Sequence, residues 1–172
     1  VEQSLSKLKL RGPDYSSVVC SENFKTGHAR LSIIDVSDSA NQPMQDITGR
    51  FTMVFNGEFF NFKKYRCELE NQGIIFKSSG DSEVLLYLFI KEGIKCIDKI
   101  NGFFSFAVYD SVENILTIVR DRYGVKPLFY YNDDNKIVFA SELKAILEYD
   151  IKRELDYSSL SAYFQLNYIP AP

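Results

Sequence analysis

The pattern of apolar and polar residues predicts a series of strands in the second half of the chain. The segments with this pattern are Phe103 to Tyr109, Asn114 to Arg120, Leu128 to Tyr131 and Lys136 to Ala140. In the first segment Phe104 and Phe106 share one face, whereas Phe103 and Ala107 share the other. Because both faces are apolar, we expect the sheet to be covered on both sides.

The first half predicts shorter strands separated by polar segments. Strand candidates are Val18-Val19, Arg30 to Val36, Phe51 to Phe55, and Ile74 to Phe76. The third of these is expected to stop at Asn56-Gly57, because this dipeptide is a turn signal. Helices are expected at Ser4 to Leu10, Asn61 to Gln72, Ser82 to Lys91, Ser141 to Glu148 and Tyr157 to Leu166. Gly73 and Gly93 are well placed to end the second and third helices.

Together these elements predict an α+β fold. Strands linked by hairpins, such as those joined by Asp133-Asp134-Asn135, pair antiparallel. Two antiparallel sheets that face each other, with helices outside, form a four-layer α-β-β-α sandwich. A chain of 172 residues suits a single domain, which we assign to residues 1–172.

Composition and charge exclude several classes of protein. The net charge of -3 and the absence of a basic tract argue against binding to nucleic acid or anionic lipid. The longest apolar run, Val84 to Ile90, is far short of the ~20 residues that a membrane span needs. Three scattered cysteines and no CxxC motif predict no metal site and a reducing compartment, the cytoplasm. The chain has no initiator Met and opens at Val1 as though in mid-helix, so we expect a fragment.

Three candidate site groups stand out, each with a structural alternative. Asn56 and Gly57 could aim a side-chain amide and a backbone N–H at one oxygen, as an oxyanion hole requires, or could simply form a turn. Arg30, among apolar neighbours, needs an anion, which could be a ligand carboxylate or Asp35 or Glu58 of the chain itself. Asp81 precedes a helix, where it could cap the helix, bind a ligand ammonium, or do both.

Other polar groups are interpreted as structural. The charged segment Arg120 to Pro127 is expected to form a salt-bridged corner. His28 and the three cysteines, Cys20, Cys67 and Cys96, have no catalytic partner in the sequence. From the residues alone, the chain is consistent with a pocket for an amino acid, with a cation for its carboxylate, acids for its ammonium and amide donors for a polar side chain.

Several motifs, taken in order, carry a family resemblance. They are Arg11-Gly12-Pro13-Asp14, Gly27 to Asp35, Phe55-Asn56-Gly57-Glu58-Phe59-Phe60-Asn61, Gly80-Asp81-Ser82-Glu83-Val84, Asp121 to Leu128 and Phe139 to Ala145. In this order they resemble the class II glutamine amidotransferase domain of glutamine-hydrolysing asparagine synthetases, over nearly the whole chain. The resemblance implies the N-terminal nucleophile hydrolase fold, in agreement with the four-layer prediction.

The resemblance also implies roles for individual residues. Asn56 and the Gly57 N–H would form the oxyanion hole, Arg30 would bind the α-carboxylate of L-glutamine, and Glu58 and Asp81 would bind its α-ammonium group. Backbone groups of Leu31, Ser32, Ile33 and Ile34 would line the pocket. In the family the nucleophile is an N-terminal cysteine that lies upstream of the Arg-Gly-Pro-Asp motif. Val1 cannot supply that thiol, so we expect these 172 residues alone to be inactive.

The resemblance leaves the partners and the acceptor open. It implies no cofactor in this domain, and ATP and Mg²⁺ in a synthetase domain that follows residue 172 and amidates aspartate. A homodimer is left open. Two alternatives remain: a non-catalytic glutamine-binding or relic regulatory domain, and an amidotransferase of a polysaccharide or antibiotic pathway.

Overall fold

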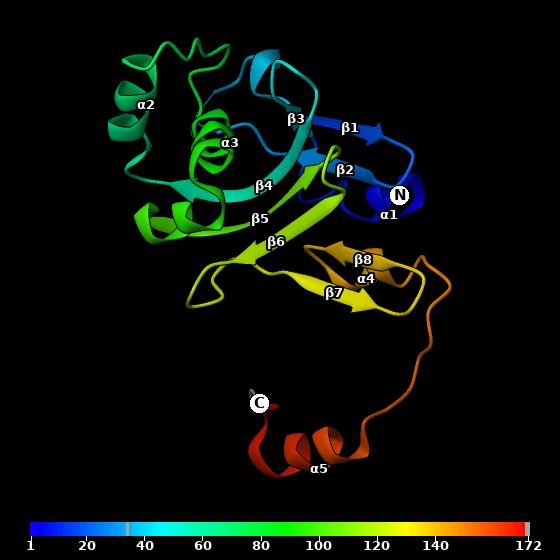
Figure 1. The fold of residues 1–172 in the computed structure, drawn as a ribbon. Coiled ribbons are helices and arrows are strands. Elements are labelled where there is room, and N and C mark those ends of the chain that lie inside the picture. The colour runs from blue at the N-terminus through cyan, green and yellow to red at the C-terminus, as the bar shows by residue number, and fades with distance from the viewer. Residues whose placement is uncertain (34, 171–172) are drawn as a thin grey trace.

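The computed structural model describes residues 1–33 and 35–170 (Figure 1). Its strands are β1 (Tyr15–Cys20), β2 (Lys25–Arg30), β3 (Met44–Gln45), β4 (Phe51–Phe59), β5 (Gly102–Asp110), β6 (Ile115–Arg120), β7 (Phe129–Asn132) and β8 (Ile137–Ala140). Its helices are α1 (Glu2–Lys7), α2 (Phe62–Glu70), α3 (Asp81–Glu92), α4 (Leu143–Ile146) and α5 (Tyr157–Leu166), with 3₁₀ turns η1 (Asp38–Ala40) and η2 (Gly93–Lys99).

The centre of the molecule is an antiparallel sheet in the order β3-β4-β5-β6. One face of this sheet packs against α3, which in turn packs against α2 (Figure 1). Between them lies the main apolar core, where Met53 and Phe59 of β4 meet Phe106 of β5 and Leu85 and Leu86 of α3. The alternation of side chains along β4 and β5 therefore places the odd residues of β4 and the even residues of β5 on the helix side.

The opposite face of the sheet is covered by two separate hairpins, β1-β2 and β7-β8. Phe24, in the β1-β2 turn, stacks on Tyr109 of β5 with 4.4 Å between ring centroids, which joins the two layers. Outside the hairpins, α1 packs on β2 and α4 packs on β7 and β8. The four-layer α-β-β-α arrangement is thus confirmed. Helix α5 lies apart from the layers at the end of an extended segment and buries no residue (Figure 1).

The structure corrects the sequence prediction at three places. Strand β4 does not end at Asn56-Gly57 but continues through both residues to Phe59, paired with β5. Residues Ile74 to Phe76 form no strand. The strand expected from Arg30 to Val36 lies earlier, at Lys25–Arg30, and the chain leaves the hairpin after Arg30; position 34 lies outside the described residues. By contrast, α3 ends at Gly93 as predicted, and the φ of 61° there explains why a glycine ends it.

Candidate functional site

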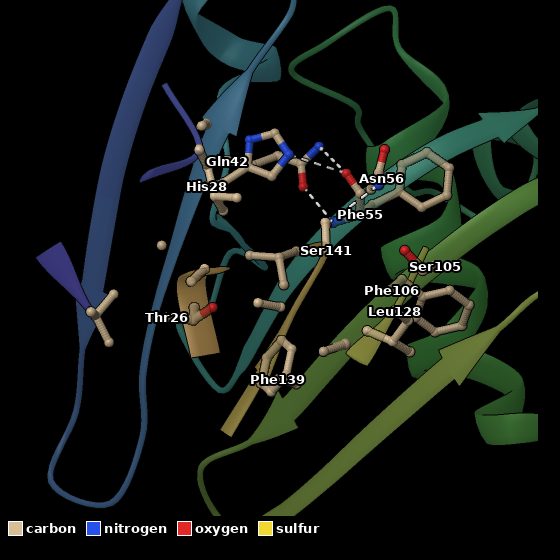
Figure 2. Close-up of a pocket in the computed structure, with 18 of the residues that line it drawn as sticks. Thr26, His28, Gln42, Phe55, Asn56, Ser105, Phe106, Leu128, Phe139 and Ser141 are labelled. Atoms are coloured by element: carbon tan, nitrogen blue, oxygen red, sulfur yellow. Dashed lines mark hydrogen bonds between the residues drawn. The ribbon is translucent and has the colours of Figure 1, made fainter. Parts of the chain in front are cut away.

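A cavity of about 950 Å³ lies between the central sheet and the two hairpins (Figure 2). This volume lies near the upper end of the range of about 300–1,000 Å³ that is usual for ligand pockets. Its lining includes most of the predicted site residues: Arg30, Asn56, Gly57, Glu58 and Asp81. Apolar residues also line it, among them Leu5, Leu8, Val54, Leu116, Leu128 and Phe139. Residues from distant parts of the chain therefore converge on one cavity.

The edge of β4 that faces away from β5 carries a row of backbone N–H groups. Phe104 of β5 lies opposite Gly57, and both of its backbone groups bond Asp121 at the end of β6. Gly57 and Phe104 are therefore a pair without hydrogen bonds between them, and the backbone groups of Asn56 and Glu58 are the ones that bond β5. The N–H groups of Phe55, Gly57 and Phe59 therefore point to the free edge. The first donates to the side-chain carbonyl of Gln42 at 2.6 Å, and the last to the carboxylate of Asp81 at 2.8 Å.

Gly57 occupies the middle of this row. Its N–H has no hydrogen-bond partner among the residues that the structure describes, although both neighbouring donors on the edge are held. A Cβ at Gly57 would lie 2.3 Å from the backbone oxygen of Phe103, closer than atoms can approach, so only glycine fits. An N–H that is held in place and unbonded is available to an oxygen in the cavity.

Asn56 supplies a second donor beside Gly57. Its side chain lies on the cavity face of the sheet and donates one N–H to the hydroxyl of Ser141 at 3.4 Å (Figure 2). A primary amide has two N–H donors, so one remains for a ligand. Ser141 follows β8, and this contact links the β7-β8 hairpin to the candidate oxyanion hole.

Arg30 is buried, with 7% of its surface exposed, at the end of β2. Its guanidinium donates to the backbone oxygens of Asp35 and Ser37, the latter at 3.0 Å, and to the side-chain oxygen of Asn41 at 2.6 Å. Neither carboxylate predicted as its structural partner, that of Asp35 or that of Glu58, forms a salt bridge with it in the described part of the chain. Neutral oxygens leave the positive charge unbalanced, and two of the five N–H groups have no partner there.

Asp81 lies at the start of α3 but does not cap it. Gly80 is the capping residue, and the carboxylate of Asp81 instead holds the N–H of Phe59. Burial raises the pKa of Asp81, the hydrogen bond from Phe59 lowers it less, and the nearby charge of Glu58 raises it further. Both acids line the cavity. A cationic group between them would relieve their repulsion and favour the charged form of Asp81.

The segment after Arg30 lies only partly at the cavity. Leu31 and Ile33 line it, whereas Ser32 does not, and its N–H donates to the carboxylate of Asp14 at 2.8 Å. The fourth predicted residue of this segment, Ile34, lies outside the described residues. Of the three described positions in this segment, Leu31 and Ile33 lie at the cavity and Ser32 does not.

Two cavity residues had no predicted role at the site. Gln42 lies between η1 and β3, in a segment for which the sequence predicts no helix or strand, and His28 is a residue that the sequence indicates as structural. Both donate to the backbone oxygen of Phe55, each at 3.2 Å (Figure 2). Burial lowers the pKa of His28 to about 4, with a smaller contribution from the charge of Arg30, so its ring is neutral near pH 7. A lone glutamine in a loop gives no sequence signal for such a contact.

The charged segment from Arg120 to Pro127 differs from the salt-bridged corner that the sequence predicts. Within the described residues, the corner from Arg120 to Lys126 is held by hydrogen bonds to the backbone and not by a salt bridge between side chains. Asp121 accepts from three N–H groups of the corner, and Arg120 donates to the oxygens of Gly124 and Lys126. None of the cysteines lines the cavity. Burial raises the pKa of the Cys96 thiol to about 12, which makes it unreactive.

Among residues 1–33 and 35–170, no group of three His, Cys, Asp or Glu side chains is placed to hold a metal ion. Over the same residues, none of the helices has the length and apolar character required to cross a bilayer.

Comparison with known proteins assigns the family. The sequence matches the family described as glutamine amidotransferase domain over residues 1–172. The chain belongs to this family. It is 39% identical over 169 residues to asparagine synthetase [glutamine-hydrolyzing] 3 of Bacillus subtilis, covering 96% of this chain and 27% of the relative. The amidotransferase domain is also 34% identical to a putative asparagine synthetase [glutamine-hydrolyzing] 2 of Methanocaldococcus jannaschii, covering 96% of this chain and 36% of that protein.

A third relative carries a different name. Amidase chry2 of Gibberella zeae is 36% identical, and the match covers 93% of this domain and 24% of that protein. The chain thus spans about a quarter to a third of the length of these relatives.

Among solved structures, the domain is similar to a glutamine phosphoribosylpyrophosphate amidotransferase from B. subtilis. The TM-score is 0.69 at 22% identity, over 83% of this chain and 39% of that one. The likeness shows the fold, that of the N-terminal nucleophile hydrolases, in agreement with the four layers of the amidotransferase domain.

Proposed function

We propose that this domain hydrolyses L-glutamine to supply ammonia, as part of a glutamine-dependent asparagine synthetase. The observation that carries the proposal is the unpartnered Gly57 N–H beside the Asn56 amide, in a cavity that Arg30, Glu58 and Asp81 also line, among the residues that the structure describes. A cation and two acids match the two charged ends of a free amino acid. The amide donors match its side-chain carbonyl.

Each residue would act by binding or by stabilising charge. The two remaining N–H groups of Arg30 would bind the α-carboxylate, and Glu58 and Asp81 the α-ammonium group. The side-chain carbonyl oxygen would then lie against Gly57 and Asn56. Attack on the carbonyl carbon moves negative charge onto that oxygen, so both hydrogen bonds strengthen as the tetrahedral intermediate forms. Ammonia leaves when the intermediate collapses to the acyl-enzyme, and water releases glutamate in the second half-reaction.

The nucleophile would come from outside these 172 residues. None of the three cysteines lines the cavity, and the single histidine is neutral and bonded to the backbone. We propose an N-terminal cysteine on an upstream segment, whose α-amino group takes the thiol proton. The cavity volume of about 950 Å³, near the upper end of the range of about 300–1,000 Å³ that is usual for ligand pockets, leaves room for such a segment beside the substrate.

The acceptor reaction would take place in another part of the full-length protein. The relatives that are named asparagine synthetases are about three times as long as this chain or longer. We therefore propose a downstream synthetase domain that uses ATP and Mg²⁺ to activate aspartate. Three cysteines without disulfide bonds favour a reducing compartment, and we propose the cytoplasm.

The test is an assay of the full-length protein with either glutamine or ammonia as nitrogen source. Asn56→Ala should lower kcat for glutamine hydrolysis by about 10²–10³, because one oxyanion donor is lost. Asparagine formation from free ammonia should be unchanged, since it bypasses this site. If the wild-type protein makes asparagine from ammonia but never hydrolyses glutamine, the domain is a relic and the proposal fails.

A further inference from the structure

We propose that Gln42 is a positioning residue of the glutaminase site, which acts by holding the edge of β4 that presents the Gly57 N–H. This inference rests on the proposed function. It concerns a residue that does not touch the reacting atoms and acts through the backbone of Phe55.

The side-chain amide of Gln42 binds Phe55 as a neighbouring strand would. Its carbonyl oxygen accepts from the Phe55 N–H at 2.6 Å, and its NH₂ group donates to the Phe55 oxygen at 3.2 Å (Figure 2). The two bonds run in opposite directions between the same pair of groups, which is the pattern of a hydrogen-bonded pair in an antiparallel ladder. The side chain of Gln42 thus makes the two hydrogen bonds that a residue of an adjacent strand would make.

These hydrogen bonds are needed because β3 is short. It pairs only Met44 and Gln45 with Met53 and Thr52, so the edge of β4 beyond Met53 has no strand beside it in the described part of the chain. Phe55 is nevertheless buried, and unpaired backbone groups there would be costly. Gln42 is itself 7% exposed, and its backbone oxygen accepts from the Ser17 hydroxyl of β1 at 2.7 Å. A continuous set of contacts therefore joins the β1-β2 hairpin to the edge.

Phe55, whose backbone is bonded by Gln42, lies two residues from Gly57 on the same edge of β4. Asp81 holds the N–H of Phe59 two residues away on the other side. With both neighbours fixed, the Gly57 N–H has little freedom to tilt or shift. Loss of one support should move the donor while leaving it present, and a displacement of about 1 Å in an active site can cost on the order of 10²-fold in rate.

The test compares two substitutions of Gln42 in the full-length protein. Gln42→Met keeps the length of the side chain but removes both hydrogen bonds. We expect kcat for glutamine hydrolysis to fall on the order of 10²-fold, with KM nearly unchanged, because the charged ends of the substrate are bound elsewhere. Synthesis from free ammonia should be unaffected. Gln45→Met is the matched control, since the Gln45 side chain bonds the Thr52 hydroxyl, at 3.1 Å, and not the backbone of β4.

Gln42→Glu adds a readout that a structural role would not give. An ionised carboxylate at position 42 can accept from the Phe55 N–H but repels the Phe55 oxygen, whereas the protonated acid restores the donor. Burial favours the protonated form, so activity relative to wild type should rise as pH falls from about 8 toward about 6. His28 stays neutral over this range because its pKa is about 4. The other charged group nearby is the guanidinium of Arg30, which donates to the side-chain oxygen of the neighbouring Asn41.

The outcomes separate the two proposals. If the wild-type protein hydrolyses glutamine, but Gln42→Met lowers only the melting temperature and Gln42→Glu shows a flat ratio to wild type, the positioning role is wrong and the proposed function stands. If Gln42→Met does not fold, the pH profile of Gln42→Glu decides. If the wild-type protein hydrolyses no glutamine, the proposed function fails and takes the positioning role with it.

Discussion

The two sides of the central sheet are built differently. On the side of α2 and α3, the sheet packs into a continuous apolar core, where Met53, Leu85 and Leu86 are fully buried. On the other side, the sheet faces two short hairpins across a cavity, and buried polar groups such as Arg30 and Gln42 line the space. The helix side therefore supplies most of the apolar stabilisation, and the hairpin side holds the groups that could bind a ligand.

The comparison shows how the fold keeps polar groups fixed beside a cavity. Strand β4 belongs to both sides. Its Phe59 side chain lies in the apolar core, while its Asn56 side chain faces the cavity. A rigid core on one face thus fixes the donors on the other, which is how a site gains preorganised hydrogen bonds.

The largest expected effect on stability comes from a substitution in the apolar core on the helix side of the sheet. Leu86→Ala should lower the free energy of unfolding by about 2–5 kcal/mol, because a fully buried leucine leaves a cavity that the neighbouring residues fill only in part. Urea denaturation of the purified domain measures this change. Leu10→Ala, at a residue that is 92% exposed, should change stability by less than about 0.5 kcal/mol. Equal losses for the two variants would contradict the assignment of the core.

An acid titration sharpens the comparison on the hairpin side. Burial lowers the pKa of His28 to about 4, below its ordinary value of 6.5. As pH falls, His28 is therefore protonated in the unfolded chain before it is protonated in the folded protein. The free energy of unfolding should decrease between about pH 6.5 and about pH 4, by roughly 3 kcal/mol in total. Above about pH 6.5 this group contributes no pH dependence.

His28→Gln is the control for this titration. Glutamine can still donate to the Phe55 oxygen but does not titrate, so the decrease over the same acid range should become shallower. The measurement is the free energy of unfolding at a series of pH values for both proteins. An unchanged slope in His28→Gln would show that another group causes the acid sensitivity.

The smallest effect concerns an ion pair at the rim of the central sheet. Arg50 donates to both carboxylate oxygens of Asp110, at 2.8 and 2.6 Å, and the pKa of Asp110 is lowered to about 2. Arg50 is partly exposed, so solvent screens the pair, and Arg50→Ala should destabilise the domain much less than Leu86→Ala does. Thermal melts at low and high salt should show that the difference shrinks with ionic strength. A loss as large as that of Leu86→Ala would remove the distinction between core and rim.

The layers were predicted well from the sequence because periodicity reports burial directly. The double-faced strand from Phe103 to Tyr109 and the helix that ends at Gly93 are both found. The prediction failed where tertiary contacts override local preference. Asn56-Gly57 favours a turn locally, but pairing with β5 holds both residues in a strand. Conversely, Ile74 to Phe76 is apolar but pairs with no strand.

Partners of polar side chains were harder to predict than the residues themselves. Arg30, Glu58 and Asp81 were identified as candidates, and all three line the cavity. Their contacts were not foreseen, since Arg30 bonds a loop through backbone oxygens and Asp81 holds a strand rather than capping a helix. Which oxygen lies opposite which donor depends on the path of the loop from residue 35 to residue 41, and no local pattern encodes that path.

The most direct measurement is calorimetric titration of L-glutamine into the full-length protein with its proposed nucleophilic cysteine replaced by alanine. Asp81→Asn keeps an acceptor for the Phe59 N–H but removes the charge that would bind the ammonium group. We expect it to weaken glutamine binding by about 1.5–3 kcal/mol. The same substitution should not change the affinity for a glutamine analogue in which hydrogen replaces the α-amino group. Equal glutamine affinity in both proteins, or no binding to the protein with intact Asp81, would contradict the account.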